Sequence, residues 1–529
     1  MTNSNFSGIS CPAEKKAALP ISSVLLSILS GIILTASFPQ WGLSFLAWFA
    51  FIPLFISIDN KSPSHAFKLG LIAGLSHYLT LLYWILIVLG HYGHLNIFAS
   101  IFPLILLSLY LSLFPAVFSI LARSMDNPRS GLIVTSCSWV GLEYLRSKLM
   151  TGFPWCLTGY TQYRNLYLIQ IADICGVYGL SFMIVFINIL IYYSFFKRRE
   201  PYRGLLKWHF LTALLLVGGT LVYGHYRLPN EKMKEEYNYS LKAVIIQANI
   251  DQSVKWNPDF QTETMDIYSR LTRSSFLFKP DLIIWPETSA PFFFQSNPGL
   301  SSRVFSIAEE SGAALIFGSP AYKQIVGKIN YLNRAYLIPP GGRTEYYDKV
   351  HLVPFGEYIP LKKLLFFVNK LAAAAGDFKA GDRINPLNYD DLSIGILICY
   401  EAIFPEIARA EAKEGANLLV NITNDAWFGK SGAPFQHLSM AIFRAVETRI
   451  PLIRAANTGI SAFIDPCGRI ICAGSLFKEE VLKHKITVCK SPKQTFYTRF
   501  GDIFAFIAII TVIAQYLWII VHMFPRTRE

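Results

Sequence analysis

The sequence predicts a chain in two parts, a polytopic α-helical membrane domain of about eight spans and a water-soluble α/β domain inserted before the last span. Three observations lead to this fold class. The 529 residues are 53% hydrophobic and only 16% charged, whereas a soluble protein carries about 25% charged residues. Long apolar runs fill both ends of the chain, and ordinary soluble sequence occupies residues 226–498. Within that stretch, short apolar runs alternate with helical patterns, which is typical of helices covering sheet faces.

The membrane domain is predicted from apolar runs of spanning length, about 20 residues each. They lie at 20–38, 41–58, 69–90, 98–122, 131–149, 167–196, 205–224 and 502–524. We expect the first run to be retained as an anchor, since further spans follow it at once. The run at 131–149 is the weakest because it contains Glu143 and Arg146. We expect these two side chains and Asp173 to lie near span ends and to reach the membrane surface.

The basic residues of the short loops predict the orientation. An even number of spans places both termini on one face, and most loop lysines and arginines then share that face. Only Arg146, Lys148 and Arg164 fall in short loops on the other. By the positive-inside rule the shared face is cytoplasmic, which makes the insert extracytoplasmic. The net charge of +13 therefore indicates topology and contact with anionic lipid, not nucleic-acid binding.

These assignments divide the chain into three segments. Residues 1–225 are the N-terminal membrane domain with seven spans, 226–498 the extracytoplasmic α/β domain, and 499–529 the C-terminal span with its cytoplasmic tail. Inside the insert, we expect strands at 241–248, 281–285, 313–318, 334–338, 393–399, 417–422, 452–456 and 461–465. We expect helices at 260–277, 301–312, 404–414 and 435–449.

Two loops of the insert are unusually apolar for a soluble domain. One contains Phe292, Phe293 and Phe294, and the other runs from 361 to 375. Such loops either pack in the core or form an apolar rim in contact with lipid. We expect the segments 292–294 and 364–368 to touch the bilayer or to form a lipid entrance.

Four residues at or near strand ends could carry covalent acyl chemistry. Cys399 closes an apolar strand before a helix, where helix N–H groups favour a thiolate; the alternative is a buried structural cysteine. Glu287 follows an apolar strand and could act as a general base, because a partly dry pocket raises a carboxyl pKa. Lys349 could stabilise an oxyanion, although for a lysine considered alone a place on the surface is the favoured alternative. Glu357 lies in a turn rich in aromatic residues, and the alternative for it is an ordinary loop acid.

Histidines and cysteines give weaker signals. His351 and His437 could serve as bases for a Cys–His pair, but we prefer capping or packing roles for both. The eight cysteines form neither a paired framework nor a Cys/His metal cluster, and Cys467 and Cys472 could pair only if their Cβ atoms faced each other. The sequence therefore predicts no metal and no cofactor.

The combination of motifs resembles a known superfamily. The segments 285–287, 348–357 and 398–401, with 421–429, are similar to the Glu–Lys–Cys signature of the nitrilase, or carbon-nitrogen hydrolase, superfamily. With seven predicted spans before the insert and one after it, the whole chain resembles the family of bacterial apolipoprotein N-acyltransferases. Two further stretches match that family, 247–256 and 454–461.

The resemblance implies an α-β-β-α sandwich on the periplasmic side of the inner membrane, and a ping-pong reaction. Glu287 would take the thiol proton, and Cys399 would attack an ester carbonyl of a phospholipid donor, with phosphatidylethanolamine expected. Lys349 and the backbone N–H of Tyr400 would bind the oxyanion, and Glu357 would support Lys349 or relay protons.

The second half-reaction and the pocket follow from the same resemblance. The α-amine of an N-terminal S-diacylglyceryl-cysteine on an apolipoprotein would attack the thioester, giving the amide of a mature lipoprotein. Trp256, Tyr400 and Glu401 match positions that shape the substrate pocket. One alternative is a membrane-tethered nitrilase-type amidase acting on a small soluble substrate. A transporter with an accessory domain is a weaker alternative, because the spans hold few ionisable residues.

Overall fold

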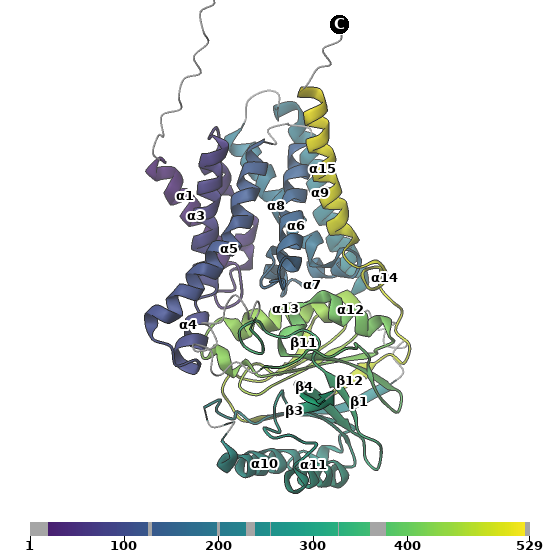
Figure 1. Ribbon diagram of the computed structural model, residues 1–529. Helices are drawn as coiled ribbons and strands as arrows, with labels where there is room; N and C mark the ends of the chain where they lie inside the picture. Colours follow the sequence, from purple (N-terminus) through teal and green to yellow (C-terminus); the bar gives the residue numbers. More distant parts are fainter. Residues whose placement is uncertain are drawn as a thin grey trace, which may run out of the picture.

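The computed structural model describes residues 19–124, 130–197, 202–228, 239–253, 255, 257–325, 327–359 and 377–523. Figure 1 shows a bundle of helices, here called the helical bundle, seated on one face of a layered α/β domain. Its last helix, α15 (Ile503–Met523), follows the α/β domain in sequence and runs away from it, so its C-terminal end lies at the far side of the bundle (Figure 1).

The helical bundle is built from long apolar helices joined by short segments. Its long helices are α1 (Ile21–Ala36), α3 (Pro63–Leu81), α5 (Ile97–Ser124), α6 (Gly131–Lys148), α8 (Ala172–Phe196), α9 (Tyr202–Arg227) and α15. Its short helices are η1 (Ser44–Trp48), α2 (Ile52–Ile58), α4 (Ile85–Ile87), η2 (Val88–Tyr92), η3 (Thr158–Gln162) and α7 (Leu166–Ile169).

The described helices support membrane character, but not eight separate spans. By length and composition, Ile97–Arg123, Ala172–Phe196 and Ile503–His522 could each cross a membrane. Pro63–Leu81 with Ile85–Tyr92, bent by 54°, makes a fourth if the pair is one span. The run expected at 41–58 is not a single helix, because it is divided into η1 and α2. A new helix starts there at Ile52-Pro53, where proline fits the first turn.

The α/β domain contains two six-stranded sheets. The first has the order β12-β1-β2-β3-β4-β5, and the second β11-β10-β9-β8-β7-β6. The strands of the first are β1 (Tyr239–Gln247), β2 (Leu282–Ile284), β3 (Ala314–Ile325), β4 (Lys328–Ile338), β5 (Glu345–Asp348) and β12 (Glu480–Val488). Those of the second are β6 (Leu387–Tyr389), β7 (Leu392–Ile398), β8 (Leu418–Thr423), β9 (Leu452–Ala456), β10 (Ala462–Ile464) and β11 (Ile470–Ala473).

Helices cover the outer face of each sheet. The helices are α10 (Pro258–Arg273) and α11 (Pro298–Ser311) on the first sheet, and α12 (Pro405–Lys413) and α13 (Ala433–Thr448) on the second. One apolar core joins the inner faces of the two sheets, and another lies between the first sheet and α10 and α11. The layers therefore run α-β-β-α, as expected, with α10 and α11 farthest from the helical bundle (Figure 1).

All eight predicted strands and all four predicted helices of this domain are present, but four further strands were not expected. They are β5, β6, β11 and β12. The longest of them, β12, pairs antiparallel with β1 over the full nine residues at the edge of the first sheet. Its polar face carries Lys483 and Lys485, and an edge strand needs apolar side chains on one face only. This alternation of polar and apolar residues is a weaker sequence signal for a strand than the continuous apolar runs of the buried strands.

The helical bundle packs directly on α12 and α13. Apolar side chains of both parts form one continuous cluster, which includes Phe118 and Phe186 from the bundle and Phe443 from α13. Hydrogen bonds cross the same boundary. The Trp155 indole donates to Gln436 at 2.8 Å, and each residue is buried. The catalytic domain is therefore fixed to the bundle through its α12–α13 layer.

Charged side chains at this boundary do not reach into solvent. Asp173 is 2% exposed, and its Oδ2 accepts hydrogen bonds from Arg227 and Arg449, each with an N···O distance of 2.8 Å. Glu143 accepts from the backbone N–H of Thr158, at 2.7 Å. The expectation that acids and bases near span ends extend to the membrane surface is therefore wrong for these residues, because they pair inside the protein.

Arg146 was also expected to reach the membrane surface, and it does not. It is 2% exposed, and its guanidinium donates to the backbone carbonyl of Trp155 at 3.1 Å. The loop that contains Trp155 carries the contacts to α13, so Arg146 supports the docking surface from within the bundle.

Candidate active site

The parallel strands of the two sheets place the predicted residues at one edge of the domain. In the first sheet β1, β2 and β3 run parallel, and in the second β7, β8 and β9 do. Glu287 follows β2, Cys399 follows β7, and Lys349 follows the antiparallel strand β5. Parallel strands present their carboxyl ends at the same edge, which brings the loops after β2 and β7 together.

Cys399 occupies a strained turn between strand and helix. It is the first residue of η7 (Cys399–Ile403), directly after β7, and its φ is +53°. Non-glycine residues adopt positive φ rarely, and such strain clusters at functional sites. The side chain is half-buried. The predicted junction of strand, turn and helix is therefore present, with α12 beginning at Pro405.

The Cys399 thiol is neutral in this site. Burial and, after it, the Glu287 carboxylate raise the pKa of the thiol to about 12, and Lys349 opposes that rise only in part. The expected influence of nearby helix N–H groups on the thiol stays a prediction. A nucleophile held in this way needs a base.

Glu287, the predicted base, interacts electrostatically with the Cys399 thiol. It is 6% exposed, and two donors hold its carboxylate: the Asn333 amide at 2.8 Å and the backbone N–H of Asn424 at 3.0 Å. The Lys349 Nζ lies 3.7 Å from the same carboxylate. Fixed on both oxygens, the carboxyl group keeps one orientation.

Lys349 is held as a cation by two carboxylates. It is 1% exposed, with its Nζ 2.9 Å from Glu357 and 3.7 Å from Glu287. Burial alone would lower the pKa of Lys349, but Glu357 and Glu287 outweigh it and raise that pKa. Lys349 is therefore a permanent positive charge at the site, as oxyanion stabilisation requires.

Glu357 and Asn333 complete this network. Glu357 accepts from the Asn333 amide at 2.8 Å and, through its other oxygen, from the backbone N–H of Val353 at 2.8 Å. Asn333 thus bridges Glu357 and Glu287. Sequence analysis missed Asn333. The sequence carries little signal for it, because Asn333 lies beside Arg334 in β4 and is not the single polar residue of an apolar run.

Glu401 lies behind the site. It is fully buried, and one oxygen accepts from the backbone N–H groups of Val350 and His351, at 2.7 and 3.1 Å. The other accepts from the N–H of Ile398 at 2.7 Å, and Tyr347 donates to the carboxylate as well. Glu401 therefore ties the Lys349 segment to the Cys399 turn. Its predicted part in shaping the substrate pocket stays a prediction.

Tyr400 and His351 form an aromatic group beside the nucleophile. Tyr400 is 8% exposed, and its ring packs against Phe404 with 5.1 Å between ring centroids. The His351 ring lies 3.7 Å from the Phe404 ring, centroid to centroid. His351 thus packs against its neighbours. Trp256, expected to shape the pocket, lies outside the described residues.

His437 contacts the backbone of the nucleophile. Its Nε2 lies 3.1 Å from the Cys399 carbonyl oxygen, and its Nδ1 lies 3.0 Å from Asp425. Asp425 in turn forms a buried ion pair with Arg454, at 2.6 Å. These contacts hold the backbone of the strained turn at Cys399, which agrees with a packing role for His437.

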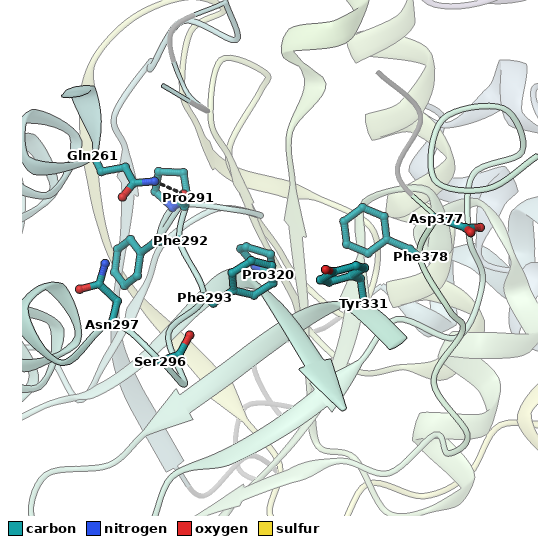
Figure 2. Close-up of a pocket in the computed structure, with 10 residues that line it drawn as sticks. All are labelled: Gln261, Pro291, Phe292, Phe293, Ser296, Asn297, Pro320, Tyr331, Asp377 and Phe378. Carbon is teal, nitrogen blue, oxygen red and sulfur yellow. Dashed lines mark hydrogen bonds between the residues drawn. The ribbon is translucent and has the colours of Figure 1, made fainter. Parts of the chain in front are cut away.

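An open cavity of about 630 Å³ lies next to this site. Figure 2 shows Phe293, Tyr331 and Phe378 among its lining side chains. Among the described residues that line the cavity, none is a predicted catalytic residue, but two are close to the network: Tyr331 precedes Asn333 by two residues on β4, and the Phe378 N–H donates to the Glu357 carbonyl at 3.0 Å. Its volume is in the range of ligand sites.

The apolar loop at 292–294 is only partly as predicted. Phe292 and Phe294 belong to the core beneath α10 and α11, the layer farthest from the helical bundle. For these two, the prediction of bilayer contact is wrong, because they fill the space between sheet and helices. Phe292 also lines the cavity, and Phe293, which is outside this core, lines it with its ring 5.8 Å from that of Tyr331, centroid to centroid. The second predicted segment, 364–368, lies outside the described residues.

Comparison with known proteins agrees with the two-part architecture. A family model for the apolipoprotein N-acyltransferase N-terminal domain matches residues 30–190, and one for carbon-nitrogen hydrolase matches residues 242–490. An amidase structure from Nesterenkonia sp. has a TM-score of 0.36 and 21% identity, covering 47% of this chain and 90% of that one.

Relatives match over nearly the full length. The apolipoprotein N-acyltransferase of Geobacter metallireducens is 47% identical over 497 residues, which cover 93% of this chain and 94% of that protein. That of Pasteurella multocida is 32% identical over 508 residues, covering 92% and 94%. The chain therefore belongs to the apolipoprotein N-acyltransferase family.

Proposed function

We propose that this protein transfers a fatty acyl chain from a phospholipid to the α-amino group of the N-terminal S-diacylglyceryl-cysteine of apolipoproteins. One observation carries the proposal. Cys399, at a positive-φ turn, shares its site with the Glu287 carboxylate and the buried Lys349 ammonium, on a domain docked against apolar helices. Such a site can form a thioester and can receive substrates anchored in a membrane.

In the first half-reaction, Glu287 takes the proton of the Cys399 thiol. The thiolate attacks the ester carbonyl carbon of the phospholipid, phosphatidylethanolamine being the expected donor. Lys349 and the backbone N–H of Tyr400 bind the resulting oxyanion. When the C–O bond breaks, Glu287 returns the proton to the leaving oxygen. The products are a lysophospholipid and an acyl thioester on Cys399.

In the second half-reaction, the neutral amine of the acceptor attacks the thioester. Glu287 takes the proton that the amine loses, the C–S bond breaks, and the proton returns to the Cys399 sulfur. An amide forms on the lipoprotein. Glu357 keeps Lys349 charged and in place, and we assign Glu401 to positioning the Cys399 turn. Trp256 and Tyr400 remain predicted contacts of the substrates.

The proposed setting is the bacterial inner membrane, with the catalytic domain in the periplasm and both termini in the cytoplasm. The arrangement in Figure 1 supports it, because the C-terminal end of α15 and the catalytic domain lie at opposite sides of the helical bundle. The bias of basic residues in the loops adds support for the direction.

Intact mass spectrometry after incubation with phospholipid alone tests the proposal. We expect the enzyme to gain the mass of one acyl chain, located on Cys399 and released by hydroxylamine. Cys399→Ser serves as the control and should gain nothing. Wild-type enzyme that turns over small amides and never gains an acyl chain from phospholipid would favour the membrane-tethered amidase instead.

A further inference from the structure

Lys255 is a second buried lysine near the nucleophile, and the proposed mechanism leaves it without a role. It is 1% exposed, and its Nζ donates to the backbone carbonyl of Glu287 at 3.1 Å. It comes from the loop between β1 and α10. That loop is fixed to the second sheet, because Asn424 donates to Gln252 at 2.6 Å and Asn457 pairs with the backbone of Ile250.

The charge of Lys255 faces the reacting groups. In the described part of the chain its hydrogen bond goes to a neutral carbonyl, whereas Lys349 pairs directly with carboxylates. Its ammonium interacts electrostatically with Glu287 and with Cys399. Burial lowers the pKa of Lys255 to about 8, so the ammonium is still the main form at neutral pH.

A count of charges indicates what this ammonium contributes. Nearest the thiol, the resting site holds two carboxylates, Glu287 and Glu357, two ammonium groups, Lys349 and Lys255, and a neutral Cys399 thiol. Burial raises the pKa of the more distant Glu401 to about 7, so this acid is partly neutral and adds no positive charge. Moving the thiol proton to Glu287 leaves this sum at zero, and so does adding the thiolate to a carbonyl. Without Lys255, two carboxylates would face a single cation in a dry site, which favours protonation of the base and disfavours the thiolate.

We propose that Lys255 balances the charge of the catalytic site, an inference that rests on the proposed function. Its ammonium would stabilise the Glu287 carboxylate at rest, and the Cys399 thiolate and the oxyanion during the reaction. Other charged groups around the thiol do not replace it. Lys349 is already matched by Glu357 and Glu287, and Asp425, which is negative, is matched by Arg454. His437 faces the Cys399 carbonyl oxygen.

Alkylation of Cys399 by iodoacetamide tests this role without any lipid substrate. The full-length enzyme is treated between pH 6 and pH 10, and the adduct is followed by mass spectrometry. Lys255→Gln keeps a donor for the Glu287 carbonyl but has no charge, and Lys255→Met has neither. We expect both variants to react at least about tenfold more slowly at pH 6 to 7, where wild-type Lys255 is charged, and the profiles to converge above pH 8, where the wild type loses that charge as well.

Lys483→Met is the matched control. Lys483 also donates to a backbone carbonyl, that of Ser274 at 2.9 Å, but it is exposed on β12. Its profile should coincide with that of the wild type. A Lys255→Gln profile that also coincides with the wild type would overturn the inference and leave Lys255 a positioning residue. Loss of the folded state in Lys255→Gln would overturn it as well, because charge balance does not require Lys255 for folding.

The outcome is separable from that of the proposed function. If phospholipid never acylates Cys399, the proposed function fails, while the effect of Lys255 on thiol reactivity can still be measured. If acylation proceeds and the alkylation profiles coincide, only the role of Lys255 fails.

Discussion

At the scale of single residues, the site combines a neutral thiol with a fixed base and a fixed cation. Burial and the Glu287 carboxylate keep the Cys399 thiol protonated, so proton transfer to Glu287 must accompany attack. A neutral thiol is a poor nucleophile. Cys399 therefore stays unreactive until its proton is transferred, which suits an enzyme whose substrates must first bind.

The raised pKa of Cys399 predicts a specific pH dependence. Below its pKa of about 12 the thiol is mainly protonated, and the thiolate fraction grows about tenfold with each pH unit. We expect the rate of wild-type Cys399 alkylation to rise from pH 6 to pH 10 without the plateau of an ordinary thiol near pH 8.5. A stopped assay with iodoacetamide measures it. A plateau below pH 8 would mean that the resting site does stabilise a thiolate.

Removing the base or the cation should block acylation of Cys399. Glu287→Gln keeps the shape but cannot accept the proton, and Lys349→Ala removes the charge that binds the oxyanion. Each should slow formation of the acyl adduct by about 10²–10⁴-fold. Single-turnover mass spectrometry with phospholipid provides the rate. A normal rate in Lys349→Ala would show that the oxyanion is held by other groups.

Sequence analysis singled out residues that follow strands. It missed two residues that reach Glu287 from other parts of the fold. Glu287, Lys349 and Cys399 each follow a short apolar run, which is visible in one dimension. Asn333 and Lys255 matter because β4 and the loop after β1 bring them to Glu287 from 46 and 32 residues away. Such pairings depend on sheet order, and no local pattern predicts them.

At the scale of elements, strands buried on both faces were predictable and edge elements were not. The strand β9 was predicted to the residue at 452–456, since its whole length is buried. The edge strand β12 and the break between η1 and α2 were missed, because exposure and a proline each weaken the apolar pattern. Apolar loops are similarly ambiguous. Phe293 and Phe294 are adjacent, yet one lines a cavity and the other fills a core.

These two phenylalanines form a matched pair for mutagenesis. Phe294→Ser should lower the stability of the domain by about 3–5 kcal/mol, because it empties a packed position. Phe293→Ser should leave the melting temperature nearly unchanged and slow the use of lipid substrates, if the cavity admits them. Thermal unfolding and acyl transfer per folded molecule are the two measurements. Equal loss of stability in both variants would contradict a cavity-facing role for Phe293.

At the scale of the whole molecule, the bundle and the catalytic domain are joined by apolar packing and by buried ions. The cluster that includes α13 continues into the bundle without a break. Asp173 of α8 binds Arg449 of the catalytic domain and Arg227 of α9, so three parts of the chain meet at one carboxylate. These contacts set where the catalytic domain packs on the helical bundle.

Removing Asp173 should weaken this attachment. Asp173→Ala leaves Arg449 with an unpaired charge, and breaking a buried pair in this way costs about 3–5 kcal/mol. We expect a clear fall in melting temperature and faster proteolysis at the boundary. Arg273→Ala, which breaks the exposed pair with Glu310, is the control and should leave both unchanged. Equal effects of the two variants would argue against a docking role for Asp173.

The central claim is that one acyl chain passes from phospholipid through Cys399 to a lipoprotein amine. The most direct test isolates the enzyme after incubation with labelled phospholipid, removes free lipid, and then adds a peptide that begins with S-diacylglyceryl-cysteine. The account predicts that the label leaves Cys399 and appears as an amide on the peptide α-amine, with no further donor present. Label that stays on the enzyme, or leaves as free fatty acid at the same rate without peptide, would contradict it.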